Sequence, residues 1–461
     1  MRPSGLAGSL LDFPLTPGIH TALMPAIPEV KIEHGLVRGL RRLDLVALVL
    51  NVIIGAGIFG LSSQAFALAG AYSVLAYLVC AVPILLIVLC FAEVSSRFSA
   101  TGGLYLYARE AFGPVVGFEI GWLAWLTRLT GFAALCNLFA DYMGYFFSDL
   151  GSGMGRLVVI GGVVSGLTAA NIAGLRAASW FSNILTVAKL VPLLLLIVAG
   201  FSFIDIHTYT QAPPPTYTAF SASVLLLVFA FTGFEMVGIP AGEARDPRRH
   251  LPFAFLTGAG AAVLLYISIQ AVCIATVTGL ATSRQPLADA GARLLGASGA
   301  SMIAAGALVS VLGTMHVIML SAPRLLFAMA EQAQLPQTIS RAHRRFRTPH
   351  VAILLSAAGM LILSLSGTFA SAALLSTIFR LITYATTCAA LPVLRRRRDI
   401  EKALFSLPAG DLISAIALVL LVWLLSSGSW REVNQLLIGI VLGLVLYGVF
   451  RWKGTHLSSR I

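Results

Sequence analysis

Among the ionisable side chains that lie within long apolar stretches, four are the first candidates for chemistry in this chain of 461 residues. They are Arg128, Lys189, Glu235 and Arg380. A charged group at the depth of a bilayer is costly to bury, so it usually pairs with an opposite charge or faces a cavity. These residues therefore predict either structural ion pairs or a polar site inside a membrane protein.

For the two arginines, one interpretation is a structural ion pair with an acidic group on a neighbouring apolar segment. The candidate partners are Glu93, Glu119, Asp141 and Glu235. Glu235 can instead take part in proton coupling, because it lies beside a helix break. The sequence leaves both roles of Glu235 open.

Two apolar stretches are interrupted by small residues at corresponding positions of two halves of the chain. The first is VIIGAGIFG at 52–60 and the second is FAFTGFEMVG at 229–238. In a bilayer, a broken helix is tolerated where it is buried in protein or lines a cavity, and a matched pair of breaks indicates a transporter site. Close packing of helices through small residues is the alternative explanation.

The exposed backbone groups at such breaks can bind a zwitterion. A helix N-terminus carries unpaired N–H groups and partial positive charge, whereas the preceding half presents free carbonyls. We expect the N–H groups at 55–57 to hold a carboxylate. Carbonyls near Ile53, Ile54, Phe229 and Ala230 are expected to hold an ammonium group, which together describes an amino acid.

Composition predicts the elements that position these residues. The chain is 58% hydrophobic and 11% charged, with a mean hydropathy of +0.90. We predict an all-α polytopic membrane protein with twelve transmembrane helices. They span residues 43–69, 73–96, 112–147, 157–174, 178–200, 219–243, 252–279, 299–330, 350–367, 369–394, 409–427 and 432–451. Residues 286–296 are expected to form a short surface helix.

The predicted organisation has three parts. Residues 1–42 form a cytoplasmic tail, residues 43–395 form a core of spans one to ten, and residues 396–461 hold spans eleven and twelve with a cytoplasmic C-terminus. The net charge of +12 comes from basic residues in short alternate loops. This distribution predicts that both termini are cytoplasmic and gives no reason to expect a nucleic-acid partner.

Other function classes lack their motifs. The five cysteines lie in apolar segments without metal-type spacing, so we expect packing roles, no disulfides and no metal site. The sequence contains neither HExxH nor a GxxxxGK[ST] loop, and it has no repeated filter-like segment. We therefore expect no catalytic residues, no cofactor, no ATP-driven pump and no channel.

Several segments together resemble the amino acid-polyamine-organocation (APC) permeases. They are GAGIFG, SATGGLYLYAREAFG, FAFTGFEMVGIPAGEARDPRRHLP and APRLLFAMAEQAQLP, which occur in order within residues 43–395. The resemblance implies the LeuT-type fold, with a 5+5 inverted repeat and broken helices 1 and 6. By motif position, Gly55, Ala56 and Gly57 would contact the substrate carboxylate.

The same resemblance implies roles for further residues. Phe229 would be an aromatic gate, with Ile54, Ala230 and Gly233 as the floor of the site. Arg128, Phe132 and His316 are the candidates for a side-chain pocket, in which Arg128 would recognise an acidic or polar substrate side chain. The alternative for His316 is a hydrogen-bonded packing role.

Lys189, in TVAKLVPLLLLIVAG, resembles a built-in replacement for the sodium ion of other LeuT-type transporters. We expect it to bridge spans one and eight and to load and release a coupled proton. The alternative is a permanently charged strut, as in sodium-independent exchangers.

These expectations combine into a secondary active amino acid transporter of the cell membrane that works by alternating access. We predict sodium-independent, proton-coupled uptake. Amino acid exchange is the first alternative, and an amino acid sensor without flux is the second. The sequence leaves open whether the protein is a monomer or a homodimer.

Overall fold

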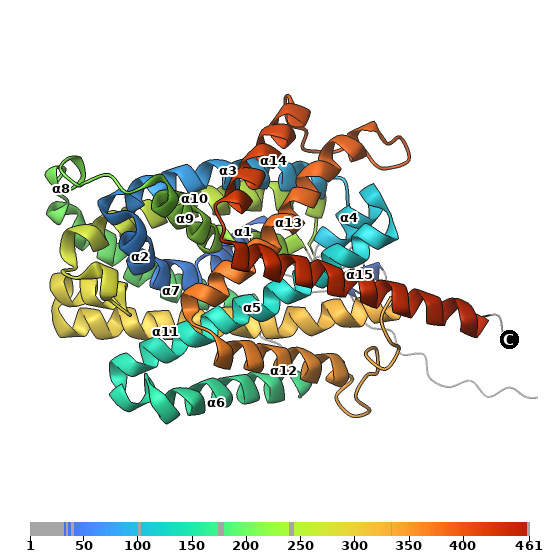
Figure 1. Ribbon diagram of the computed structural model, residues 1–461, viewed down its shortest axis with the longest axis horizontal. Coiled ribbons are helices and arrows are strands. Elements are labelled where there is room, and N and C mark those ends of the chain that lie inside the picture. Colours follow the sequence, from blue (N-terminus) through green and yellow to red (C-terminus); the bar gives the residue numbers. More distant parts are fainter. Residues whose placement is uncertain are drawn as a thin grey trace, which may run out of the picture.

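The computed structural model describes residues 32–33, 36–37, 41–99, 103–173, 179–238, 244–332 and 334–458. Within these residues the regular secondary structure is helical apart from one short antiparallel pair, β1 (Ile32–Glu33) and β2 (Leu36–Val37). That pair lies in the predicted tail and is a small departure from the all-α prediction. The helices form one elongated bundle, shown in Figure 1.

The first half of the bundle contains one broken and several continuous helices. Its elements are α1 (Arg42–Ile53), α2 (Ala56–Ala69), η1 (Gly70–Tyr72), α3 (Ser73–Ser95), α4 (Leu104–Phe112), α5 (Pro114–Phe146), η2 (Ser148–Leu150), α6 (Gly153–Ile172), α7 (Ser179–Gly200), η3 (Phe201–Phe203) and α8 (His207–Thr210).

The second half opens with the other broken helix. Its elements are α9 (Tyr217–Leu227), η4 (Val228–Phe231), η5 (Phe234–Gly238), α10 (Pro247–Thr276), η7 (Leu280–Thr282), α11 (Pro286–Glu331), α12 (His350–Ser366), α13 (Phe369–Arg396), α14 (Gly410–Ser426) and α15 (Trp430–Ser458).

The helices account for the apolar composition. Among the described residues, eight helical stretches are long and apolar enough to cross a membrane, and three further apolar helices are shorter. Helical structure lies within each of the twelve predicted ranges. The chain is therefore a polytopic helical membrane protein, while the exact number of spans stays a prediction.

The predicted surface helix is the first part of α11. Gly296, with φ 69° and ψ −168°, is non-helical and separates this part from the long helix that follows. A positive φ of this kind is readily adopted by glycine, which has no Cβ. The segment therefore turns without a loop.

Helix α5 forms the centre of the bundle. It packs against α11 and α13, while α1 packs against α7 and α10. Most of α5 is buried, whereas α6 and α15 expose apolar side chains such as Val158 and Val441. Figure 1 shows α6 and α12 along one edge and α15 across the front of the bundle.

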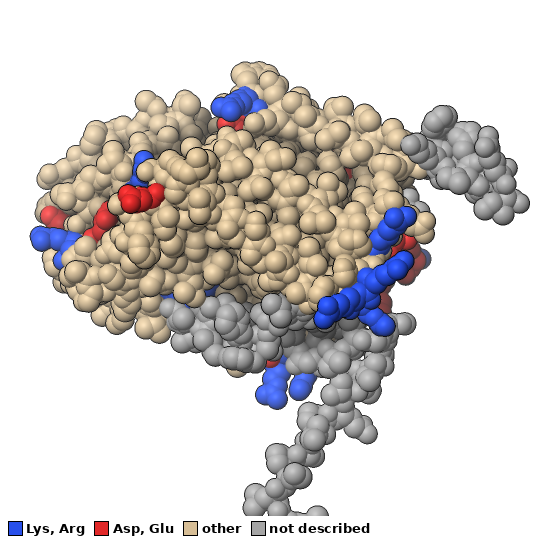
Figure 2. All heavy atoms as spheres, turned by 90° about the horizontal axis from the view of Figure 1, so that it is seen from below, with Lys and Arg blue, Asp and Glu red and all other residues tan. Residues whose placement is uncertain are grey.

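The surface has the polarity expected for a protein surrounded by lipid. Figure 2 shows one face that is mostly uncharged, with Lys, Arg, Asp and Glu in a few separate groups near its edges. An uncharged surface of this kind can lie against acyl chains, which offer no partners to charged groups.

Candidate functional site

The two helix breaks predicted from the sequence are present and pack against each other. Ile54 and Gly55 separate α1 from α2, while Thr232 and Gly233 separate η4 from η5. Because α1 contacts η5 and α2 contacts η4, the breaks face each other in the core.

Glycine is needed at two of these positions. A Cβ added to Gly57 would lie 2.4 Å from Cα of Ala230, and one added to Gly233 would lie 2.5 Å from Cγ1 of Val52. Gly233 also has a φ of 108°, which strains other residues. The small residues therefore allow close packing, as the alternative explanation required, and they also surround a cavity.

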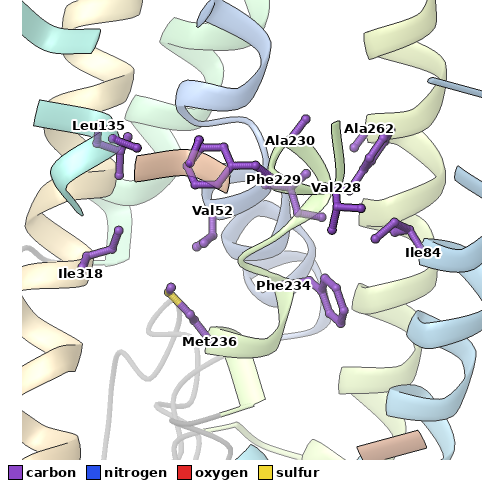
Figure 3. Packing of buried hydrophobic residues seen from close by; sticks show 14 of the residues in the cluster. Val52, Ile84, Leu135, Val228, Phe229, Ala230, Phe234, Met236, Ala262 and Ile318 are labelled. Carbon is purple, nitrogen blue, oxygen red and sulfur yellow. The ribbon is translucent and has the colours of Figure 1, made fainter. Parts of the chain in front are cut away.

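This inner cavity has a volume of about 30 Å³. It is lined by Val52, Ile53, Gly55, Gly57, Gly131, Leu135, Phe229, Thr232, Gly233, Met236, Thr314, Ile318 and Arg380. Figure 3 shows Phe229, Val52, Ile318 and Met236 around it. This volume has room for a few water molecules at most and is too small for an amino acid.

A second, wider cavity of about 640 Å³ lies beyond an aromatic pair. Phe369, the first residue of α13, lines this outer cavity. Its ring contacts that of Phe229 edge to face, with 6.2 Å between centroids. Since Phe229 lines the inner cavity, the two rings separate the cavities.

Lys189 of α7 binds the end of α1. Its Nζ donates hydrogen bonds to the carbonyl oxygens of Asn51 and Ile54, each at 2.9 Å. Span eight contributes through Ser310 of α11, whose hydroxyl donates to the same Ile54 carbonyl at 3.2 Å. Lys189 therefore reaches span one directly, and the expected bridge to span eight passes through the Ile54 carbonyl and Ser310.

Tyr266 of α10 ties the two breaks together. Its hydroxyl lies 2.7 Å from the carbonyl oxygen of Ile53 and 3.1 Å from that of Ala230. The carbonyl of Phe229 accepts from the hydroxyl of Thr232 at 2.7 Å. The carbonyls expected to hold an ammonium group thus already accept hydrogen bonds from the protein.

Glu235 belongs to an ion pair with α13. One carboxylate oxygen accepts from the backbone N–H of Gly233 at 2.9 Å and from the Tyr384 hydroxyl at 2.8 Å. The other lies 3.5 Å from Nε of Arg380. Of the two partners considered for Glu235, the structure therefore pairs it with Arg380 rather than Arg128.

Arg128 makes different contacts. It donates to the carbonyl of Ala124 at 2.7 Å and to the hydroxyl of Ser321 at 3.3 Å, and it does not line the inner cavity. It is nonetheless close enough to interact electrostatically with Glu235 and Arg380.

The other suggested counter-ions lie elsewhere. Asp141 pairs with Arg156 at 2.6 Å, and Glu93 pairs with Arg395 at 2.6 Å and with Arg97 at 3.1 Å. The carboxylate of Glu119 has no hydrogen-bond partner among the described residues and lies against Gly443.

The structure brings only part of the predicted site to the cavity. Gly55, Gly57, Phe229 and Gly233 line it, whereas Ile54 and Ala230 lie behind the lining with their carbonyls engaged. Ala56 is the first residue of α2, and its side chain lies outside the described part of the chain.

Like Arg128, the other two residues of the expected side-chain pocket do not line the cavity. Phe132 is fully buried beside the lining residue Gly131. His316 lies between Thr314 and Ile318, which line the cavity from one face of α11 because they are four residues apart. His316 is two residues away from both Thr314 and Ile318, so its side chain points to another side of the helix.

Sequence reasoning missed several lining residues. They are Arg380, Thr314, Ile318 and Met236, together with Phe369 at the outer cavity. The four-residue spacing of Thr314 and Ile318 was an available signal. The position of Arg380 within an apolar stretch made it a candidate for an ion pair or a polar site, but it did not indicate which cavity the side chain would face.

Comparisons with known proteins agree over nearly the whole chain. The family model described as amino acid permease matches residues 40–447. The serine/threonine exchanger SteT of Bacillus subtilis (strain 168) is 28% identical over 438 residues, which cover 92% of this chain and 99% of SteT.

Two further Bacillus subtilis (strain 168) proteins are similar over comparable lengths. The branched-chain amino acid permease BcaP is 25% identical, covering 93% of this chain and 96% of BcaP. The methylthioribose transporter is 24% identical, also covering 93% of this chain and 96% of that protein.

Proposed function

The chain belongs to the amino acid permease family of the APC superfamily, and from this premise we propose a secondary active amino acid transporter that works by alternating access. The family and the relatives are transporters rather than enzymes. The observation that carries the proposal is the small cavity between two facing helix breaks.

The proposed architecture is the LeuT-type fold with twelve transmembrane helices. We place the protein in the plasma membrane, with both termini in the cytoplasm. The broken α1–α2 and the broken α9–η4–η5 support this proposal, because they would be the first helices of two inverted repeats. Residues 43–395 would form the repeats, with α14 and α15 as additional helices.

The proposed substrate is an amino acid whose carboxylate binds at the start of α2. The N–H groups of a helix's first turn have no partner within that helix, and the helix dipole favours an anion there. Gly55 and Gly57 line the cavity at this point, and Ala56 would contribute backbone N–H. The ammonium group would share carbonyl acceptors at the breaks.

Substrate entry requires the cavity to widen, since about 30 Å³ cannot hold an amino acid. Phe229 is the proposed gate because its ring lies between this cavity and Phe369. Movement of the two rings apart would connect the site with the outer cavity. Their return to contact would occlude the substrate.

The proposed coupling is sodium-independent. The Lys189 ammonium group occupies the position between the carbonyls of Asn51 and Ile54, where a bound cation would otherwise compensate them. We propose that proton loading and release at Lys189, with Glu235 as a second candidate, drives uptake. Exchange is the alternative, favoured by the similarity to a serine/threonine exchanger.

Reconstitution tests the function directly. Purified protein in liposomes should take up labelled L-serine, L-leucine or L-aspartate in a saturable manner, and an inward proton gradient should increase uptake. Uptake that depends on internal amino acid would favour exchange. Binding without flux of any amino acid would identify a sensor and refute the transporter proposal.

A further inference from the structure

Arg380 is the one cationic side chain that lines the inner cavity among the described residues. Only 4% of its surface is exposed. A buried guanidinium normally donates several hydrogen bonds, because leaving N–H groups unpaired in the interior is costly. The hydrogen-bond acceptors around Arg380 therefore decide whether its burial is compensated.

The partners of Arg380 are incomplete. Its Nε lies 3.5 Å from Glu235, which forms an ion pair, but no described residue accepts a hydrogen bond from the guanidinium. The Glu235 carboxylate instead accepts hydrogen bonds from the backbone N–H of Gly233 and the hydroxyl of Tyr384. In the part of the chain that the structure describes, the Arg380 guanidinium is thus a donor without an acceptor at the wall of the cavity.

The local charge is also unbalanced. Arg128 and Arg380 are both 4% exposed and interact electrostatically, and among the described residues Glu235 is the one carboxylate found to act on both. Two buried guanidinium groups against one carboxylate leave a positive charge that a ligand can neutralise. A neutral side chain would leave this charge uncompensated.

We propose that Arg380 is the specificity-determining residue of the site and binds the side-chain carboxylate of an acidic amino acid, aspartate or glutamate. This inference rests on the proposed transport function and assigns its substrate class. The main-chain carboxylate would bind at Gly55 and Gly57, while Arg380 on α13 receives the second carboxylate as a two-pronged hydrogen-bond donor.

Competition in proteoliposomes tests the substrate class without any mutation. Wild-type protein is expected to take up labelled L-aspartate or L-glutamate with a lower KM than L-leucine and L-serine. Unlabelled aspartate should inhibit better than asparagine, which has the same shape without the charge. Saturable leucine uptake that aspartate does not inhibit would overturn the substrate class and leave the transport function standing. Absence of uptake of every amino acid would refute the transport function itself.

Substitutions then test the residue. Arg380→Gln is expected to lower aspartate uptake relative to leucine by roughly ten- to a hundredfold, since a charge-assisted pair is lost. Arg397→Gln is the matched control, because Arg397 is partly exposed, pairs with Asp399 and lies outside the cavity. An unchanged aspartate-to-leucine ratio in Arg380→Gln would overturn the inference.

A double substitution separates substrate binding from a purely structural role. If Arg380 served only to neutralise Glu235, the variant Glu235→Gln/Arg380→Gln would recover aspartate uptake, which would contradict the inference. We expect this variant to keep the lowered aspartate-to-leucine uptake ratio of Arg380→Gln, because that ratio does not depend on the overall rate of transport. Arg380→Lys should retain part of the preference, since it keeps the charge but loses the planar fork.

Discussion

At the scale of single residues, polar side chains complete the backbone at the helix breaks. Tyr266 donates toward carbonyls on both broken helices, and Lys189 donates to the end of α1. Buried carbonyls without donors are costly, so the breaks depend on side chains from α7 and α10. The unwound segments are therefore held by specific hydrogen bonds.

Removing the Tyr266 hydroxyl tests this dependence. Tyr266→Phe should lower the free energy of unfolding by about 1–3 kcal/mol, because it removes a donor shared by two buried carbonyls. Tyr77→Phe is the control, since the Tyr77 hydroxyl is buried in the same aromatic cluster without a partner among the described residues. Thermal unfolding in detergent measures both. Equal destabilisation by the two variants would argue against the bridging role.

Replacing Lys189 tests both its structural and its coupling role. Lys189→Met removes two buried charge-assisted hydrogen bonds, each worth about 1.5–3 kcal/mol, while nearly keeping the volume of the side chain. We expect transport to fall by at least roughly tenfold. Residual uptake, measured from acidic to neutral pH, should lose its proton dependence. If the variant retains the full pH dependence, Lys189 is not the proton carrier, and its role as a permanently charged structural strut remains.

At the scale of elements, the breaks were predictable and the lining of the site was not. Glycine at 55, 57 and 233 is a local signal, because glycine within an apolar stretch weakens the helix there. The lining also depends on how neighbouring helices are rotated. That rotation brings Arg380 and Thr314 to the cavity and turns Arg128 and His316 away from it.

The contact between the two breaks can be tested through one methyl group. Gly57→Ala would place a Cβ 2.4 Å from Cα of Ala230, which is backbone and cannot yield like a flexible side chain. The start of α2 must then move away from η4, so we expect uptake to fall at least roughly tenfold, as for other lost positioning of a site.

Gly162→Ala is the matched control for that substitution. Gly162 lies within α6, and a Cβ there meets no atom within 4 Å. Replacing glycine by alanine inside an open helix should stabilise the protein by about 0.5–1 kcal/mol and leave uptake unchanged. Uptake assays and thermal unfolding of both variants distinguish the effects. Normal uptake by Gly57→Ala would mean that the breaks need not touch during transport.

At the scale of the whole molecule, the basic residues predict orientation. The segment between α11 and α12 exposes a cluster of arginines, which is typical of a cytoplasmic loop. They are Arg341, Arg344, Arg345 and Arg347. On the other side lies the outer cavity, which is lined by residues of η7 and by the start of α13. The two ends should therefore face opposite compartments.

Two matched alanine-to-cysteine substitutions test this orientation, because the five native cysteines are buried and should react slowly. Ala281 in η7 and Ala342 between α11 and α12 are both exposed. In intact cells, a membrane-impermeant maleimide is expected to label Ala281→Cys and to leave Ala342→Cys unlabelled until the membrane is permeabilised. Labelling of Ala342→Cys alone would invert the proposed topology, and with it the assignment of the wider cavity as the outer entrance.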